Sequence, residues 1–393
     1  MARPRPSIGL LVTLASLSAG CPDASAPKTE HEAAVPSAAP PATASALASA
    51  PVATSPPAPS ASAPALPPFT PQRVWSEGKA MGTHVGFAGY TTRELDAAKV
   101  RAAFDRALAE IRRVEDLMTT WRPDAELSLV NAAAGKSAVK VSPETLALVK
   151  ESIHTSQISS GTFDITFETL HGLWKFDQDL DPHPPRDADL KARLAYVGYK
   201  NIQVDEAAST LKLAKDKTKI SLGGIAKGYA VDRAAKVLDD AGLTSFYVQA
   251  GGDLFARGTK PDGTGWQAGV RDPRAADPSA FFALLPLSDR AFSTAGDYER
   301  AYVTGGKRYH HIIDPRTGYP ATASRSVTVW AKTALQADAI DDAVFILGPE
   351  KGLALVESID GVGAVIVDAN NKVWVSERLK PVLKVVAQPT DGL

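Results

Sequence analysis

The first 69 residues have a composition that keeps most of them out of a packed core. Residues 22–69 are largely Ala, Pro, Ser and Thr and offer few large apolar side chains to bury. Burial then cannot offset the entropy lost on ordering the chain, so we expect a disordered, partly extended tether here. The folded domain must therefore be built from residues 70–393, which are enough for a large hydrophobic core.

Residues 1–21 have the pattern of a bacterial export signal. Arg3 and Arg5 precede an apolar run, residues 8–17, that is too short to span a bilayer. Small residues then precede Cys21, as in a lipoprotein signal whose cysteine becomes the lipidated first residue, although Leu17 stands four positions before it instead of three. We expect a lipid-anchored protein on the periplasmic, or extracytoplasmic, side of a membrane. Ordinary secretion with an incidental cysteine is the alternative.

Charge and cysteine content exclude several classes of protein. The formal net charge of −1 is typical neither of a polybasic nucleic-acid binder nor of an acidic tail protein, so we expect no nucleic-acid partner. Cys21 is the only cysteine, so no disulfide can form within the chain. The core alone must hold the fold together.

Local patterns predict an α+β domain. Apolar residues at helical spacing predict a helix in residues 104–121, and Ser142 followed by Pro143 predicts the N-cap and first turn of another. Residues 244–250 and 325–331 are typical of strands. Residues 363–377 alternate around an Asn-Asn turn, as a hairpin does. We therefore expect a mixed, largely antiparallel sheet with packed helices.

Three aspartates interrupt the apolar segment 336–348. Read as a helix, Asp338, Asp341 and Asp342 fall at i, i+3 and i+4, which places their carboxylates on one face. Like charges repel and Asp is a poor helix former, so the cluster needs a reason. Oxygen ligands of this kind suit a hard cation such as Mg²⁺, which commonly bridges phosphates. A favourable interaction with the helix dipole is the alternative, and it suits Asp338 best.

Glycine pairs mark two further turns. Residues 219–224 predict a short strand that ends at Gly223 and Gly224, with Lys227 and a helix following. Such a turn lets backbone approach a ligand, and a helix N-terminus favours phosphate, although a tight loop is the plainer interpretation of the glycines alone. A second pair precedes Asp253 and by itself indicates a bend.

Two adjacent histidines follow a predicted hairpin. Residues 302–309 are expected to turn at a Gly-Gly pair, and His310 and His311 come directly after. Either histidine alone can be a hydrogen-bonded core residue. In a pocket, histidine is the usual general base near neutral pH.

Eight segments, in their order along the chain, resemble the ApbE family of periplasmic FAD:protein FMN transferases, many of which are lipoproteins. The likeness covers most of residues 75–360 and implies an ApbE-like, T-fold-related domain over residues 70–393. The segments are KAMGTHVGF, LMTTWRPDAELSLVN, SSGTFDITFETLHGLW, SLGGIAKGYAVDRA, VQAGGDLFARG, STAGDYERAY, YHHIIDPRTGYP and ADAIDDAVFILGPEKG.

The resemblance implies a reaction and assigns residues to it. The family uses Mg²⁺ to cleave the pyrophosphate of FAD, attaches FMN through a phosphoester to a Thr or Ser of an acceptor protein, and releases AMP. By resemblance, Asp338 and Asp342 bind the metal through side chains and Gly224 through its carbonyl. His311 matches the histidine of the family's HxxDP motif and is the best candidate to deprotonate the acceptor hydroxyl, whereas His310 stands where the family tolerates Ser. The positions that match FAD contacts are Met81, Trp121, Thr162, Phe163, Asp164, Ser221, Lys227, Ile312 and Asp341.

Three positions depart from the family pattern. Ser221 replaces the usual Asp, Asp342 replaces the usual Thr or Ser, and Ala295 stands in TAG where TSG is usual. We expect a functional metal site, but the departures weaken the case for full transferase activity. The alternatives are an FAD pyrophosphatase that yields FMN and AMP, a non-catalytic FAD-binding lipoprotein, and a structural lipoprotein whose site has decayed. The implied acceptor is a redox subunit of a membrane ion pump or an extracytoplasmic electron-transfer protein.

Overall fold

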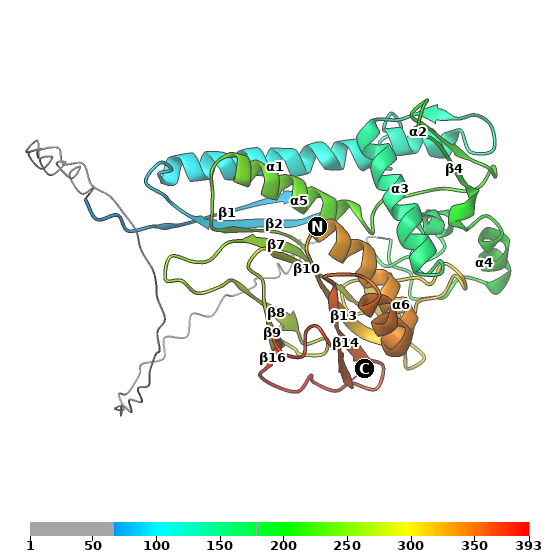
Figure 1. Ribbon diagram of the computed structural model, residues 1–393. Helices are drawn as coiled ribbons and strands as arrows, with labels where there is room; N and C mark the ends of the chain where they lie inside the picture. Colours follow the sequence, from blue (N-terminus) through cyan, green and yellow to red (C-terminus); the bar gives the residue numbers. More distant parts are fainter. Residues whose placement is uncertain (1–66, 178, 393) are drawn as a thin grey trace, which may run out of the picture. The chain divides into compact units, whose positions relative to one another are not determined.

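An eight-stranded antiparallel sheet forms the centre of the folded domain (Figure 1). The computed structural model describes residues 67–177 and 179–392, so the predicted export signal and nearly all of the predicted tether lie outside the described residues. Each neighbouring pair in the sheet is antiparallel. In spatial order the strands are β1 (Arg73–Ala80), β2 (Thr83–Tyr90), β6 (Phe246–Ala250), β7 (Asp253–Arg257), β10 (Arg290–Gly296), β13 (Ser324–Ala331), β14 (Gly363–Asp368) and β15 (Val373–Val375).

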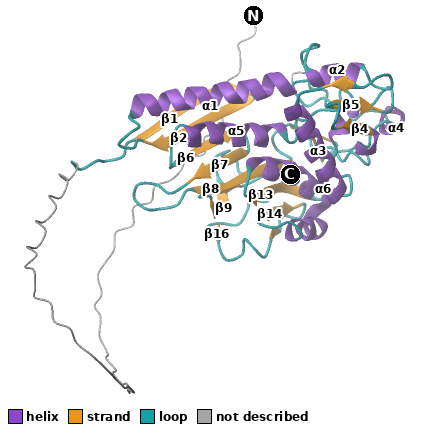
Figure 2. Cartoon of the chain, turned by 45° about the horizontal axis from the view of Figure 1, so that its top comes forward, coloured by secondary structure: helices purple, strands orange, loops and turns teal. Residues whose placement is uncertain are grey.

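Three long helices cover one face of this sheet (Figure 2). They are α1 (Ala97–Met118), α5 (Ala226–Asp240) and α6 (Ala334–Glu357), which is kinked at Gly348. The main core lies between helices and sheet and contains fully buried side chains such as Phe87, Phe104, Val231, Phe246 and Phe345. Burial of apolar area at this interface is the main force that holds α5 and α6 side by side.

A smaller sheet covers part of the opposite face. Its strands are β8 (Gln267–Arg271), β9 (Phe281–Pro286) and β16 (Lys384–Val385), in the order β16-β9-β8. Phe282 and Leu285 pack with Val365 and Leu379, and a separate cluster forms around Trp266. The middle of the large sheet is therefore buried on both faces.

The remaining elements lie at one end of the domain and in a separate ribbon. The end group comprises α2 (Glu126–Ala132), β3 (Val139–Lys140), α3 (Pro143–Ile158), η1 (Ile165–Leu170), α4 (Asp187–Leu194), η2 (Tyr199–Asn201), β4 (Ile202–Asp205) and β5 (Thr210–Leu213). The ribbon pairs β11 (Ala301–Thr304) with β12 (Lys307–His310). It belongs to neither larger sheet and leads directly into His311.

Most of the predicted elements form. The expected α+β class with a largely antiparallel sheet is confirmed, and Ser142 caps α3 by accepting a hydrogen bond from the Thr145 N–H. The helix predicted at residues 104–121 begins earlier, at Ala97, because the Asp96 side chain accepts from the Lys99 N–H and caps it there. Among the described helices, none is both long and apolar enough to cross a bilayer.

The strand predicted at residues 219–224 is wrong. The backbone of this segment is hydrogen-bonded without joining a sheet: the Ile220 N–H donates to Asn131 Oδ1 at 2.8 Å, and Asn131 Nδ2 donates to the Ile220 carbonyl at 2.9 Å. The Ser221 N–H donates to the Ile165 carbonyl at 3.0 Å. One asparagine side chain thus takes the place of a partner strand.

Candidate functional site

The three aspartates of α6 lie on one helical face, as predicted. Asp338 and Asp341 are almost fully buried, at 3% and 4% exposure, and Asp342 is half-buried. The N-terminus of α6 is held by Thr333, which caps it, and by Asp232 of α5, whose carboxylate accepts from the Ala334 and Leu335 N–H groups. This docking fixes where the first turns of α6 lie against α5.

Lys227 of α5 lies between Asp338 of α6 and the carboxylate of Asp253. Its Nζ lies 2.7 Å from Asp253 Oδ2 and 3.3 Å from Asp338 Oδ1. The other oxygen of Asp338 accepts from the Gly228 N–H at 2.8 Å. Asp341 Oδ2 accepts from the Ser293 hydroxyl at 2.6 Å. The aspartates of α6 therefore face α5, β7 and β10 at once.

Negative charge exceeds positive charge in this cluster. Asp253, Asp338, Asp341 and Asp342 approach one lysine, Lys227. Burial and the nearby Asp253 carboxylate raise the pKa of Asp338 to about 7, and burial raises the pKa of Asp342 to about 6. Burial together with Asp342 and Asp338 raises the pKa of Asp341 well above its usual range. Although burial opposes it, the charge of Asp253 and Asp338 raises the pKa of Lys227. A bound cation would relieve this excess.

The glycine turn predicted to approach a ligand lies beside the aspartates. A Cβ placed on Gly224 would stand 3.4 Å from Asp342 Oδ2 and 3.4 Å from the Phe163 ring. Thr162 is buried, and its hydroxyl donates to the Ser159 carbonyl at 2.9 Å and approaches the Ala343 carbonyl at 3.4 Å. Four predicted positions from three separate segments are therefore neighbours here: Thr162, Phe163, Gly224 and Asp342.

Oxygen atoms that suit a divalent cation are present, but the side chains alone do not complete a site. Within residues 67–177 and 179–392, no three His, Cys, Asp or Glu side chains are arranged to hold a metal ion. A cation at Asp338 and Asp342 would need further oxygen ligands, such as the Gly224 carbonyl and water molecules, one of which a phosphate oxygen could replace. The surplus of buried carboxylate and the closeness of Gly224 to Asp342 fit such a cation.

The two histidines have different environments. His310 is buried, with Nε2 2.8 Å from the Ala321 carbonyl, and its Nδ1 accepts from the Ile312 N–H at 3.3 Å. It is thus a hydrogen-bonded core residue, the plainer of the two roles considered for it. His311 is half-buried, and its Nδ1 is shielded from solvent with no hydrogen-bond partner among the described residues. Burial, reinforced by Arg300, lowers the pKa of His311 to about 3, so its ring is neutral at neutral pH.

The other predicted FAD-contact positions differ in burial and in the contacts they make. Ile312 is buried, and Ser221 is half-buried, its hydroxyl accepting from the Gly223 N–H at 3.3 Å. Met81 occupies the β1–β2 turn with φ 52°. Trp121 is 82% exposed, with its ring edge-on to His171. Hydrogen bonds and ring contacts of the described residues connect neither Met81 nor Trp121 to the carboxylates.

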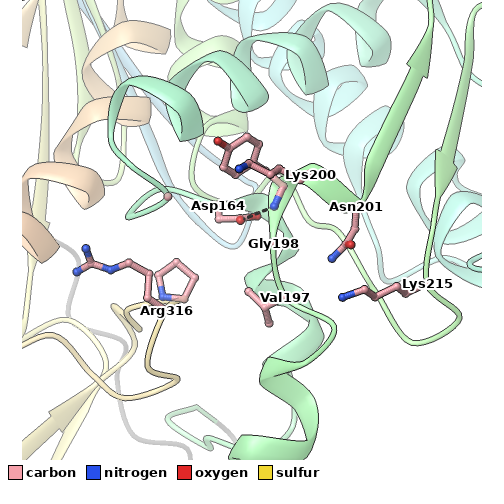
Figure 3. A pocket seen from close by; sticks show the side chains of 10 residues that line it. Asp164, Val197, Gly198, Lys200, Asn201, Lys215 and Arg316 are labelled. Carbon is pink, nitrogen blue, oxygen red and sulfur yellow. Dashed lines mark hydrogen bonds between the residues drawn. The ribbon is translucent and has the colours of Figure 1, made fainter.

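A cavity of about 330 Å³ has Gly161 and Asp164 in its wall (Figure 3). Asp164 borders it, and this carboxylate accepts hydrogen bonds from the Tyr199 N–H and from Thr166. Lys200, Lys215 and Arg316 bring positive charge to its walls, but none of the α6 aspartates lines it. The cavity therefore does not contain the carboxylate cluster.

The sequence profile of the ApbE family matches residues 81–366. The match includes the glycine turn, both histidines and the α6 aspartates. The chain belongs to the ApbE family.

Relatives within the ApbE family are similar over most of their length. The FAD:protein FMN transferase of Vibrio cholerae is 33% identical over 292 residues, which cover 73% of this chain and 86% of that protein. The FAD:protein FMN transferase of Treponema pallidum is 32% identical over 294 residues, covering 71% and 81%.

Solved ApbE structures confirm the fold. The ApbE protein of Thermotoga maritima superposes with a TM-score of 0.71 at 31% identity, covering 79% of this chain and 99% of that one. The flavin transferase ApbE of Vibrio cholerae gives a TM-score of 0.70 at 30% identity, covering 80% and 100%. The expectation of an ApbE-like α+β domain is therefore confirmed.

One member of the cluster was missed in the sequence. The glycines before Asp253 do form a turn, Gly251–Gly252, between β6 and β7. Asp253 itself is completely buried and bound to Lys227. Asp253 directly follows a glycine pair in a segment shared with the ApbE family, and this position could have marked it as a site residue.

Proposed function

We propose that this ApbE-family protein is an Mg²⁺-dependent FAD:protein FMN transferase that modifies a Thr or Ser of an extracytoplasmic acceptor protein. The observation that carries the proposal is the convergence of buried, excess carboxylate, Lys227 and the Gly224 turn in one cluster. The relatives named FAD:protein FMN transferases support it by their similarity over most of the chain.

In the proposed reaction, the acceptor hydroxyl oxygen attacks the phosphorus on the FMN side of the FAD pyrophosphate. The bond from that phosphorus to the bridging oxygen breaks, AMP leaves, and a phosphoester joins FMN to the acceptor. The hydroxyl proton passes to His311. Its ring is neutral at working pH, so one of its two ring nitrogens carries the free lone pair that a general base needs.

The negative charge of the pyrophosphate would be neutralised by Lys227 and by the Mg²⁺ that the metal ligands would hold. Asp338, Asp342 and the Gly224 carbonyl would hold Mg²⁺, which supplies charge compensation for the pyrophosphate oxygens when bound. Lys227 lies at the start of α5, where its ammonium and the helix N-terminus both favour phosphate. Asp342 adds a carboxylate where family members usually have a hydroxyl.

Location and partner complete the proposal. The sequence of residues 1–21 supports export and a lipid anchor at Cys21, which would place the domain at a membrane facing the periplasm or another extracytoplasmic space. A redox subunit of a membrane ion pump or an extracytoplasmic electron-transfer protein would then be the acceptor. FAD hydrolysis is the competing activity, because the same base can deprotonate water.

The decisive experiment incubates the full-length protein in detergent with FAD, Mg²⁺ and a candidate acceptor. An acceptor mass increased by FMN, with AMP released, supports transfer, whereas AMP with free FMN and no adduct indicates a pyrophosphatase. Recovery of unaltered FAD in every reaction would contradict both enzymatic functions.

The role of His311 gives the first variant prediction. We expect His311→Ala to slow transfer by at least about 100-fold, the usual loss when a general base is removed, while FAD affinity changes little. The matched control is His154→Ala, which replaces an exposed histidine on α3. Transfer by His311→Ala at the rate of the His154→Ala control would refute the role of the histidine as base.

A further inference from the structure

Asp253 is a buried carboxylate, and only one of its two oxygens has a polar partner among the described residues. It begins β7, its side chain is inaccessible to solvent, and its Oδ2 lies 2.7 Å from Lys227 Nζ. Its Oδ1 has no hydrogen-bond partner in the described part of the chain. Burying a carboxylate in this state costs free energy, so its position calls for an explanation beyond packing.

The turn before Asp253 holds it rigidly. Gly251 has φ 60°, and a Cβ there would stand 3.0 Å from Thr83 Oγ1 of β2. A Cβ on Gly252 would stand 3.0 Å from the Thr294 carbonyl of β10. Because the turn fits tightly between two neighbouring strands, the Asp253 carboxylate is a fixed point against which Lys227 is held.

Lys227 lies between two carboxylates that compete for it. Its ammonium is 2.7 Å from Asp253 but 3.3 Å from Asp338. Without the charge of Asp253, Asp338 would be the nearest anion, and Lys227 would pair with it more closely. Under the proposed function, Asp338 is a metal ligand, and a lysine bound to it would compete with the cation for the same oxygens.

We propose that Asp253 is a positioning residue that draws Lys227 away from Asp338 and so keeps Asp338 available to a divalent cation. The inference rests on the proposed function, because the cation is the one assigned to the transferase. It adds separate roles for the carboxylates: Asp253 holds Lys227 in place, whereas Asp338 and Asp342 are left to bind the metal.

The experiment measures Mg²⁺ binding to the full-length protein by isothermal titration calorimetry, without FAD or acceptor. The variants are Asp253→Asn, Lys227→Met and the double variant, with Asp240→Asn as a control that removes an exposed aspartate paired with Lys236. We expect Asp253→Asn to weaken Mg²⁺ binding by about tenfold, and Asp240→Asn to leave it unchanged. In the Lys227→Met background, the same substitution should weaken binding by less than about threefold, because the competing ammonium is gone.

A merely structural role for Asp253 predicts a different pattern. Loss of Mg²⁺ affinity by the same factor in both backgrounds would overturn the inference, as would unchanged affinity in Asp253→Asn or no measurable binding in the wild-type protein. Should Asp253→Asn not fold, as judged by circular dichroism, the double variant compared with Lys227→Met decides: Mg²⁺ affinities within about threefold of each other support the proposal, and a larger loss in the double variant would overturn it. FMN transfer is assayed separately, so a failure of the proposed transferase function can be distinguished from a failure of the inference about Asp253.

Discussion

Gly228 sets the distance between α5 and α6 at the point where the carboxylates converge. Its N–H donates to Asp338 Oδ2 at 2.8 Å. A Cβ at this position would lie 2.2 Å from the Ala334 carbonyl oxygen and 2.7 Å from Asp338 Cβ, both far inside van der Waals contact. Because the first obstacle is helix backbone, no side-chain rotation can relieve the clash. The absence of a side chain is what lets a carboxylate of one helix reach the backbone of the other.

This contact predicts the effect of a single methyl group. Gly228→Ala should force α5 and α6 apart, lower the free energy of unfolding by about 1–3 kcal/mol as overpacking does, and weaken Mg²⁺ binding through the displaced Asp338. Denaturant unfolding and calorimetry measure the two effects. Gly86→Ala is the matched control, since a Cβ on Gly86 of β2 meets no atom within 4 Å. Equal stability of the two variants would show that the helices yield without cost.

At the scale of elements, the start of α6 shows how two helices jointly place the site. A helix begins with N–H groups that have no partner within it. In α6, Asp232 of α5 accepts from the first two, at Ala334 and Leu335, and the Thr333 side chain accepts from Gln336. The Ala337 N–H donates to the Thr333 carbonyl. Every N–H of the first turn is thus bonded, and α6 is registered against α5 one turn before Asp338.

The carboxylate of Asp232 makes this junction sensitive to pH. Burial raises the pKa of Asp232 from 3.8 to about 6, so the folded protein holds this proton more tightly than the unfolded chain. The contribution of Asp232 to the free energy of unfolding therefore decreases as pH rises from about 4 to about 6, and it stays constant above pH 6. Relative to Asp232→Asn, the free energy of unfolding of the wild-type protein should fall by no more than about 3 kcal/mol between pH 4 and pH 6. Urea unfolding of both proteins at pH 4.5 and 7 measures the difference; a gap that widens in favour of the wild type at pH 7 would contradict the assigned shift.

At the scale of the whole molecule, features that depend on residues close in the sequence could be predicted, whereas contacts between distant residues could not. The aspartate face of α6, the cap at Ser142 and the ribbon of β11 and β12 are local patterns, and all three form. The role of Asp253 depends on a lysine 26 residues away, and that of Asp232 on a helix start 102 residues away. Neither spacing has a sequence period, so neither contact was predicted. The false strand at residues 219–224 failed for the same reason, because its partner is a distant asparagine side chain.

The charge balance of the entire site leads to the last prediction. Four carboxylates surround one lysine, and burial raises the pKa of three of them, so the metal-free fold contains repulsion that a divalent cation would remove. A ligand that binds only the folded state at 100 times its Kd stabilises it by about 2.7 kcal/mol. Thermal unfolding with saturating Mg²⁺ should therefore occur a few degrees higher than in EDTA, with NaCl at matched ionic strength showing no such shift.

Replacing Asp342 tests whether repulsion between the carboxylates causes the shift in Tm on Mg²⁺ binding. Asp342→Thr removes one charge, so its metal-free form should unfold at a higher temperature than the metal-free wild type, and Mg²⁺ should raise its Tm by less. If instead both proteins respond equally to Mg²⁺, Asp342 contributes neither repulsion nor a ligand. The excess charge would then have to lie at Asp253, Asp338 and Asp341, which are the residues that Lys227 already links or approaches.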